Sequence, residues 1–523
     1  MTDRLRLNEG NRRWWTLAAM CFALFMVMLD NTVVNVALPS IQEDLGASLA
    51  GLEWTVNAYT LTFAVLLVTG GRLGDIFGRR RMFLVGVVAF AASSAAIGLA
   101  PTQGWLVAGR ALQGVGAAFM MPGTLSIITN AFPPEERGKA IGTWAGVSAL
   151  ALAIGPVVGG ALTEYVSWRA IFFLNIPVAI GAVAVTLFAT RESRDETIER
   201  KVDFTGIVTL SAGLTALVLA LVEGNAWGWG SPEIVALLAV AVLGLGAFAV
   251  TEARVRVPMV QFEFFRSRTF LGANVVAFVV SFAMLAMFFF TAIYMQTILG
   301  YDALEAGIRF LPSTLVIMVA APIAGRLSDR IGPRPLIVAG LLLTATALFI
   351  QTHITVDTGY GLLLPSFILM GLGMGLTMSP MSTAAMNAVD ASKAGVASGV
   401  LSMSRMVGGT FGVAAIGALF QSVSHHRLDE ALAGTGVSEA EREALAANIG
   451  SGVNAAAGAP PEVVRAVREA FIDALTTSLA LSTAVAAAGA VAAMVLIGSR
   501  LPARMPDPAL RPEAAAEAEA VSV

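Results

Sequence analysis

Fourteen apolar segments, each close to the length that a helix needs to cross a bilayer, run through this chain of 523 residues. By number they are 14–37, 52–71, 82–100, 105–128, 140–164, 171–190, 204–221, 232–250, 270–299, 303–325, 336–352, 359–379, 394–420 and 474–497. A helix spans the hydrocarbon core with about 20 residues. Only 13% of the residues are charged, whereas a soluble domain carries about 25%. The sequence therefore predicts an all-α membrane protein and excludes a soluble globular fold.

The distribution of basic residues sets the expected orientation. With the N-terminus in the cytoplasm, 25 of the 33 Lys and Arg residues fall in cytoplasmic segments. Apart from Arg169 at the edge of a helix, the short loops on the other side contain none. Basic residues concentrate in cytoplasmic loops, so we expect a multi-pass protein of the cell membrane with both termini in the cytoplasm.

A short basic stretch that lies between two apolar segments occurs twice in the sequence. Residues 71–83 hold one carboxylate, turn glycines and a cluster of arginines, and residues 325–334 repeat this order. Other residues recur at a constant offset of 257 along the chain: Gly114 and Gly371, Gly116 and Gly373, Asn130 and Asn387, Gly138 and Gly395, and Gly142 and Gly399. Such repeats predict two related halves.

The repeat divides the chain into regions. We expect a cytoplasmic N-terminal segment (1–13), a six-helix bundle (14–190), a linker with two extra transmembrane helices (191–269), a second six-helix bundle (270–497) with an outer loop (421–473), and a disordered cytoplasmic tail (498–523). Within the loop, Pro461 begins a short amphipathic helix that leads into the last span. We expect no metal site, because His425 and His426 are adjacent rather than four residues apart.

Three ionisable side chains fall inside predicted helices: Asp30, Arg110 and Arg405. Charges within hydrocarbon are costly and mark functional sites by default. At 1.5 Å per residue, Asp30 and Arg110 lie ~10 Å and ~8 Å below the same membrane surface, so their depths match. Because Arg stays charged whereas Asp can be protonated, such a pair can exchange one proton's worth of charge. The alternative is a fixed ion pair that only orients two helices.

Five stretches of the sequence resemble the fourteen-helix drug:proton antiporters of the major facilitator superfamily. The basic stretch at 71–83 is similar to the superfamily's loop between helices 2 and 3, although Ile76 stands where Arg is common. The runs at 29–39, 110–116, 155–160 and 168–177 are similar to signatures on helices 1, 4, 5 and 6. The resemblance covers essentially residues 14–420. It implies the major facilitator fold and a multidrug efflux transporter important in antibiotic resistance.

The resemblance also implies roles for particular residues. Asp30 and Arg110 would be the proton-coupling pair. A kinked, small-faced helix on which the two halves rock would be formed by four residues: Gly155, Pro156, Gly159 and Gly160.

Two carboxylates would act as latches between the halves. Asp75 would face the start of helix 13 near Ser392, and Asp329 would face the start of helix 5 near Gly138. A carboxylate at a helix N-terminus is stabilised by ~0.3–1 kcal/mol. The latch positions also include Gly71, Gly78, Arg79 and Arg80. The alternative is that these loops only supply charges that set the topology.

Arg405 is a candidate residue of the substrate pocket, because it lies near mid-membrane with no obvious acidic partner in the second half. It could pair with an anionic or zwitterionic substrate group, or contact backbone carbonyls. The other candidates are Asn57, Gln113, Trp144, Tyr294 and Gln296.

We therefore expect proton-coupled efflux of amphipathic small molecules or antibiotics, with the proton gradient as the energy source. The alternatives are an exporter of the same fold for a lipid or a specific metabolite, and a non-transporting receptor or scaffold. No phosphate-binding Gly-x-x-x-x-Gly-Lys-Ser/Thr stretch is present, and nothing indicates an enzyme. We expect no cofactor, no metal and no nucleic-acid partner, and a monomer in the lipid bilayer.

Overall fold

The computed structural model describes residues 8–46, 49–195, 202–255, 258–432 and 460–498. Parts of the predicted N-terminal segment (1–7), linker (196–201, 256–257), outer loop (433–459) and tail (499–523) lie outside the described residues.

The described residues contain fourteen helices long and apolar enough to cross a membrane, which confirms the predicted number and the all-α class. They are α1 (Glu9–Leu45), α2 (Leu49–Phe77), α3 (Arg79–Gly98), α4 (Gln103–Ala131), α5 (Arg137–Tyr165), α6 (Trp168–Ala189), α7 (Phe204–Trp227), α8 (Pro232–Glu252), α9 (Arg268–Thr297), α10 (Ala303–Ile331), α11 (Pro333–Gln351), α12 (Tyr360–Asn387), α13 (Ala394–Leu432) and α16 (Pro461–Leu496). Short 3-10 helices precede three of them: η2 (Pro134–Glu136), η3 (Phe262–Arg266) and η4 (Ala391–Lys393).

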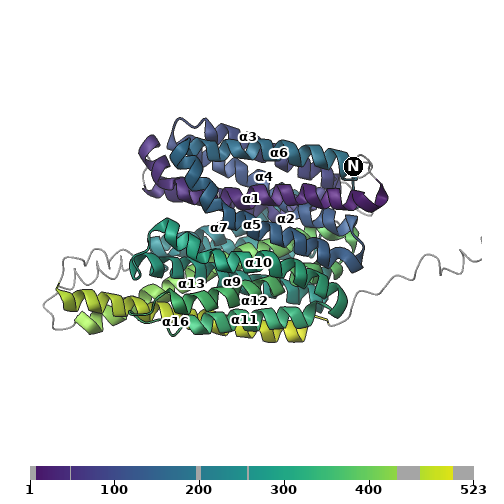
Figure 1. The fold of residues 1–523 in the computed structure, drawn as a ribbon. Coiled ribbons are helices and arrows are strands. Elements are labelled where there is room, and N and C mark those ends of the chain that lie inside the picture. Colours follow the sequence, from purple (N-terminus) through teal and green to yellow (C-terminus); the bar gives the residue numbers. More distant parts are fainter. Residues whose placement is uncertain (1–7, 47–48, 196–201, 256–257, 433–459, 499–523) are drawn as a thin grey trace, which may run out of the picture.

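The helices form two bundles that lie side by side (Figure 1). In the first, α1 packs against α5 and α6, and α4 packs against α2 and α3. In the second, α9 packs against α13, α12 packs against α10 and α11, and α16 packs against α11. The two bundles meet where α5 contacts α10 and where α2 contacts α13.

The remaining two helices, α7 and α8, pack against each other. Of the pair, α7 also contacts α2 and α13, so it lies beside one of the two seams between the bundles.

Several helices are longer than their apolar segments. α13 continues to Leu432, where the outer loop was expected to begin at residue 421, and Figure 1 shows it projecting beyond the bundle beside the start of α16. The apolar count finds only the part of a helix that lies in hydrocarbon, whereas pairs four residues apart, such as His425 with Asp429 at 3.0 Å, continue the helix in water. The helix expected from Pro461 is present and runs directly into the last span.

The repeated basic stretches are also helical for most of their length, and not loops. α2 continues to Phe77 and α10 continues to Ile331, and each ends at a glycine with positive φ, 108° at Gly78 and 86° at Gly332. A side chain is strained in that backbone region. We call the end of the molecule that carries these two stretches, at the right in Figure 1, the motif face.

Candidate functional site

Asp30 of α1 and Arg110 of α4 meet in the interior of the first bundle. Both side chains are about 1% exposed, and Nη1 of Arg110 lies 2.6 Å from Oδ2 of Asp30. The structure thus brings together the two residues whose depths match in the sequence. Removing one partner of a buried ion pair leaves an uncompensated charge, at a cost of about 3–5 kcal/mol.

Two amide side chains complete the shell around the Asp30 carboxylate. Gln113 of α4 and Asn175 of α6 each donate to Oδ1 of Asp30 at 2.9 Å. The same amides donate to Ser94 Oγ of α3, at 2.7 and 3.0 Å. Every contact that Asp30 makes here is with a donor, so the arrangement accommodates an ionised carboxylate.

Arg110 is also held by α2. Its Nε donates to the carbonyl oxygen of Thr55 at 3.1 Å, and its guanidinium lies 4.3 Å from the ring centre of Tyr59. The cluster of Asp30, Arg110, Gln113, Asn175 and Ser94 therefore ties together α1, α2, α3, α4 and α6, and we call it the Asp30 cluster.

The Asp75 latch joins the two bundles at the motif face. Its oxygens accept from the backbone N–H groups of Gly395 and Val396, at 3.0 and 2.8 Å, near the start of α13. Arg79 donates to Asp75 through Nε at 2.8 Å and through Nη2 at 2.5 Å, and Nη2 also donates to the carbonyl of Ser392. A carboxylate that accepts hydrogen bonds from a helix N-terminus is held by both the bonds and the helix dipole.

Asp329 makes the corresponding contact on the other seam. It accepts from the backbone N–H groups of Gly138 and Lys139, both at 2.9 Å, at the start of α5. Asn130 and Arg137 add two more bridges between the bundles, to the carbonyl of Ala391 at 3.1 Å and to the side chain of Asn387 at 2.8 Å. These polar contacts all lie at the motif face.

The latch glycines Gly71 and Gly78 have different structural roles. Gly71 lies inside α2 against Gly395, where a Cβ would collide with the carbonyl oxygen, so it permits close helix contact rather than a turn. Gly325 stands in the same way against Gly138. The turn itself belongs to Gly78, after which the backbone N–H of Arg80 donates to Glu192 at 3.0 Å.

The resemblance implies that the small residues at 155–160 form the helix on which the two halves rock. In the structure, Gly155 and Gly159 contact α1 of the same bundle and not the other bundle. Gly155 packs against Thr32 of α1, and Gly159 packs against Val33 of α1, within the first bundle. α5 is one continuous helix through Pro156 and Gly160. The surface of α5 that meets the other bundle is formed by Gly138, Gly142 and Gly146, which lie on a different side of the helix and nearer the motif face.

The expected pocket residues are not all brought together. Arg405 of α13 lies 6.0 Å from the ring centre of Trp144 of α5, so the two side chains come from different bundles. Gln113 instead belongs to the Asp30 cluster, and Tyr294 is buried with its hydroxyl donating to Thr358 at 2.6 Å.

The other two candidates lie apart from Arg405. Asn57 of α2 lines a small space against α7, and Gln296 near the end of α9 is exposed. Arg405 has a distant contact with Ser402 Oγ at 3.5 Å, and no acidic partner is recorded for it among the described residues.

Ser94 and Asn175 were not predicted as site residues, although the sequence gives a signal for each of them. Asn175 lies in the run at 168–177, and Ser94 is a polar residue within an apolar helix. The contacts of Asn175 with Asp30 and with Ser94 become evident only when α3 and α6 are packed.

These features define a multi-pass membrane protein with two bundles, a buried Asp–Arg pair and two inter-bundle latches. The Major Facilitator Superfamily model matches residues 20–413. The chain therefore belongs to the major facilitator superfamily and is a transporter of small molecules, not an enzyme.

Similar curated proteins are resistance and export proteins. The chain is 39% identical to the tetracenomycin C resistance and export protein of Streptomyces glaucescens, over 79% of this chain and 76% of that protein. It is 41% identical to the puromycin resistance protein of Streptomyces alboniger, over 77% and 81%. It is 32% identical to the multidrug transporter protein MdtP of Bacillus subtilis, over 81% and 78%.

A solved structure supports the fold. The human organic anion transporter MFSD10 aligns with a TM-score of 0.59 at 13% identity, covering 91% of this chain and 99% of that one. At this identity the likeness concerns the fold alone.

Proposed function

We propose that this transporter exports amphipathic small molecules, antibiotics among them, across the cytoplasmic membrane in exchange for protons. The names of its relatives support drug export. The observation that supports proton coupling is the Asp30 cluster, because it holds an ionisable carboxylate buried in the interior of a bundle.

Proton exchange follows from the way the donors surround Asp30. Its two oxygens accept from Arg110, Gln113 and Asn175, and these bonds favour the ionised carboxylate, so a proton would bind more readily when a donor withdraws. A movement of α1 relative to α4 or α6 would withdraw a donor and favour the neutral acid. Returning the donors would expel the proton. Arg110 remains charged throughout and supplies the fixed countercharge.

The latches give the exchange its direction. Asp75 and Asp329 join the bundles at the motif face, so the arrangement seen here is closed on that face. We infer that this face is cytoplasmic, and that Asp30 takes up its proton from the opposite side while substrate leaves. Breaking both latches would then open the cytoplasmic side for proton release and substrate entry.

The substrate is proposed to bind between Trp144 and Arg405. The two side chains come from different bundles, so a ligand held by both would be released when the bundles separate. An aromatic ring suits an apolar ring system, and the guanidinium suits an anionic or zwitterionic group.

We propose that one chain is sufficient, because both latches and the Asp30 cluster form within it. The rocking units would be residues 14–190 and 270–497, with 191–269 as the insert. No cofactor or nucleic acid enters this mechanism, and the proton gradient supplies the energy.

Expression in a host that lacks its own efflux pumps tests the proposal. The wild-type chain should raise resistance to several amphipathic antibiotics and lower their accumulation, and Asp30→Asn should abolish both effects. Asp44→Asn is the matched control on the same helix: hydrogen bonds from Arg169 and Trp168 lower the pKa of Asp44, so this exposed carboxylate is charged at the working pH. Equal resistance with Asp30→Asn and wild type would refute the proposal.

A further inference from the structure

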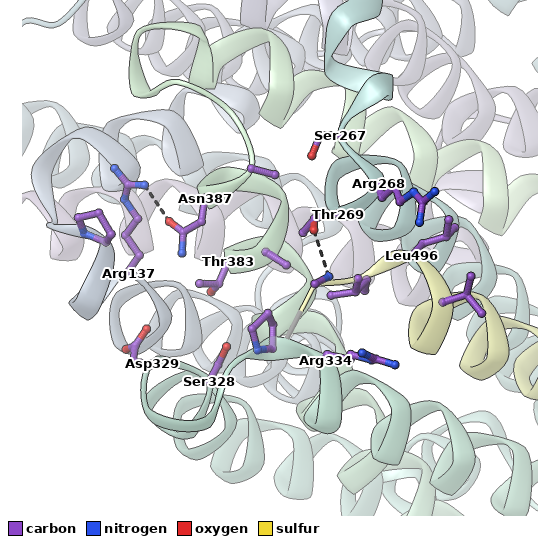
Figure 2. Close-up of a pocket in the computed structure, with 17 residues that line it drawn as sticks. Arg137, Ser267, Arg268, Thr269, Ser328, Asp329, Arg334, Thr383, Asn387 and Leu496 are labelled. Carbon is purple, nitrogen blue, oxygen red and sulfur yellow. Dashed lines mark hydrogen bonds between the residues drawn. The ribbon is translucent and has the colours of Figure 1, made fainter. Parts of the chain in front are cut away.

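A cavity of about 740 Å³ opens on the motif face, between the second bundle and the start of α5 (Figure 2). We propose that this cavity binds the phosphate of an anionic lipid headgroup. The transport mechanism above uses only one residue of its wall, Asp329.

The first argument is unbalanced positive charge. Arg137, Arg268 and Arg334 all line the cavity. Arg137 is held by Asn387 at 2.8 Å, whereas no hydrogen bond or ion pair is recorded for Arg268 or Arg334 within the described part of the chain. Against these three arginines the wall holds one carboxylate, Asp329, which accepts hydrogen bonds from the N-terminus of α5, so the positive charge remains in excess.

The second argument is a buried hydroxyl group without a partner. Ser328 is 2% exposed and lines the cavity beside Asp329 (Figure 2), and among the described residues its Oγ has no hydrogen-bond partner. Buried polar groups are nearly always satisfied. An anionic oxygen at this point would accept the hydroxyl proton.

Two long helices also begin at the cavity. α9 starts at Arg268 and has 30 residues, and α11 starts at Pro333 and has 19. The N-terminus of a helix favours an anion through its dipole. Together with the arginines, this favours a phosphate over a neutral ligand.

The position of the cavity favours a lipid over free phosphate. Val495 and Leu496, at the end of α16, line it. On the same helix Val491, Met494 and Val495 are 57%, 48% and 64% exposed, and they offer an apolar surface to acyl chains. The spans α9 and α11 start at the cavity, and the span α16 ends there. Because the ends of the spans lie at the membrane surface, the cavity would lie at the depth of the lipid headgroups.

The repeat supplies an internal comparison. A smaller cavity, of about 440 Å³, occupies the corresponding place in the first bundle and includes Asn130, the counterpart of Asn387. There Arg13 pairs with Glu136 at 2.8 Å, and Arg12 donates to the carbonyl of Ala189 at 3.0 Å. Both of these arginines have partners within the protein. Of the two cavities, the larger one is therefore better suited to an external anion.

The lipid would also favour one conformation. Pro134 and Arg137 belong to the first bundle, so the wall of the cavity is complete only while the motif face is closed. A ligand that binds one state preferentially shifts the population toward it.

Native mass spectrometry of the purified full chain tests the proposal. The probes are phosphatidylglycerol, phosphatidylcholine of the same acyl chains, and inorganic phosphate. The wild type should retain phosphatidylglycerol at least tenfold better than phosphatidylcholine. The double variant Arg268→Gln with Arg334→Gln should lose that preference, whereas Arg254→Gln, an exposed arginine outside the cavity, should keep it.

Two results would overturn the proposal. One is an equal preference in the double variant and the wild type, with unchanged melting temperatures showing that both are folded. The other is displacement of the bound lipid by millimolar inorganic phosphate, which would assign the cavity to the free anion. Ser328→Ala gives a second, milder test, because it should lower retention without removing any charge.

Discussion

Asp30 occupies a place where a charge is tolerated only because every neighbour is a donor. Arg110 supplies the countercharge, and Gln113 and Asn175 fix the second oxygen. A hydrogen bond to a charged group contributes about 1.5–3 kcal/mol. The contacts of the Asp30 carboxylate therefore depend on how α1, α4 and α6 pack.

Removing one of those donors should move the pH dependence of transport. In Asn175→Ala the carboxylate loses one hydrogen bond, so protonation competes better and occurs at a higher pH. A loss of about 1.5 kcal/mol corresponds to about one pH unit. The half-maximal pH of substrate exchange should rise by that amount. The control Asn225→Ala, at the far end of α7, should leave it unchanged, and an unshifted value in Asn175→Ala would contradict this role.

The sequence predicts part of this site, because depth along a helix can be counted. The contact between Asp30 and Arg110 follows from their distances to the membrane surface. The place of Gln113 does not, because its helix face depends on the neighbours of α4. The role of Ser94 could not be predicted either, because the sequence does not specify the partner of a lone serine in an apolar helix.

At the scale of elements, the latches depend on helices that extend beyond their apolar segments. α2 continues through Gly71 and Asp75, which places the carboxylate at the start of α13. The sequence predicted these partners from the resemblance, but it placed Asp75 in a loop. Polar residues mark the end of the hydrocarbon, and they do not mark the end of a helix.

Neutralising a latch should open the motif face. Asp75→Asn keeps the shape of the side chain but removes the charge that meets Arg79 and the start of α13. A change of ~0.5–2 kcal/mol enriches the open state several-fold. Distances between spin labels at Arg81→Cys and Ile331→Cys, in a Cys21→Ser background, should shift toward longer values. Unchanged distances with full transport would leave Asp75 only a role in topology.

At the scale of the whole molecule, the two bundles are joined by seams of glycine and by polar contacts at one face. Gly142 and Gly399 let α5 and α2 approach the opposite bundle closely near that face. α7 flanks one of these seams. In the proposed mechanism the bundles rotate about these seams while the motif face opens and closes.

The orientation of the molecule gives a direct prediction. We expect both termini in the cytoplasm and the segment between α13 and α16 outside. In the Cys21→Ser background, an impermeant thiol reagent applied to intact cells should label Ser438→Cys and leave Ser522→Cys unlabelled until the cells are permeabilised. The reverse pattern would contradict the fourteen-helix topology.

The central claim is that Asp30 carries the exchanged proton. In reconstituted vesicles with only a pH gradient, worth ~1.4 kcal/mol per unit, the wild type should concentrate substrate against its gradient. Asp30→Asn is fixed in the neutral form, so it should lose this accumulation while still binding substrate, and Asp44→Asn should behave as wild type. If Asp30→Asn concentrates substrate as the wild type does, the proton is carried elsewhere.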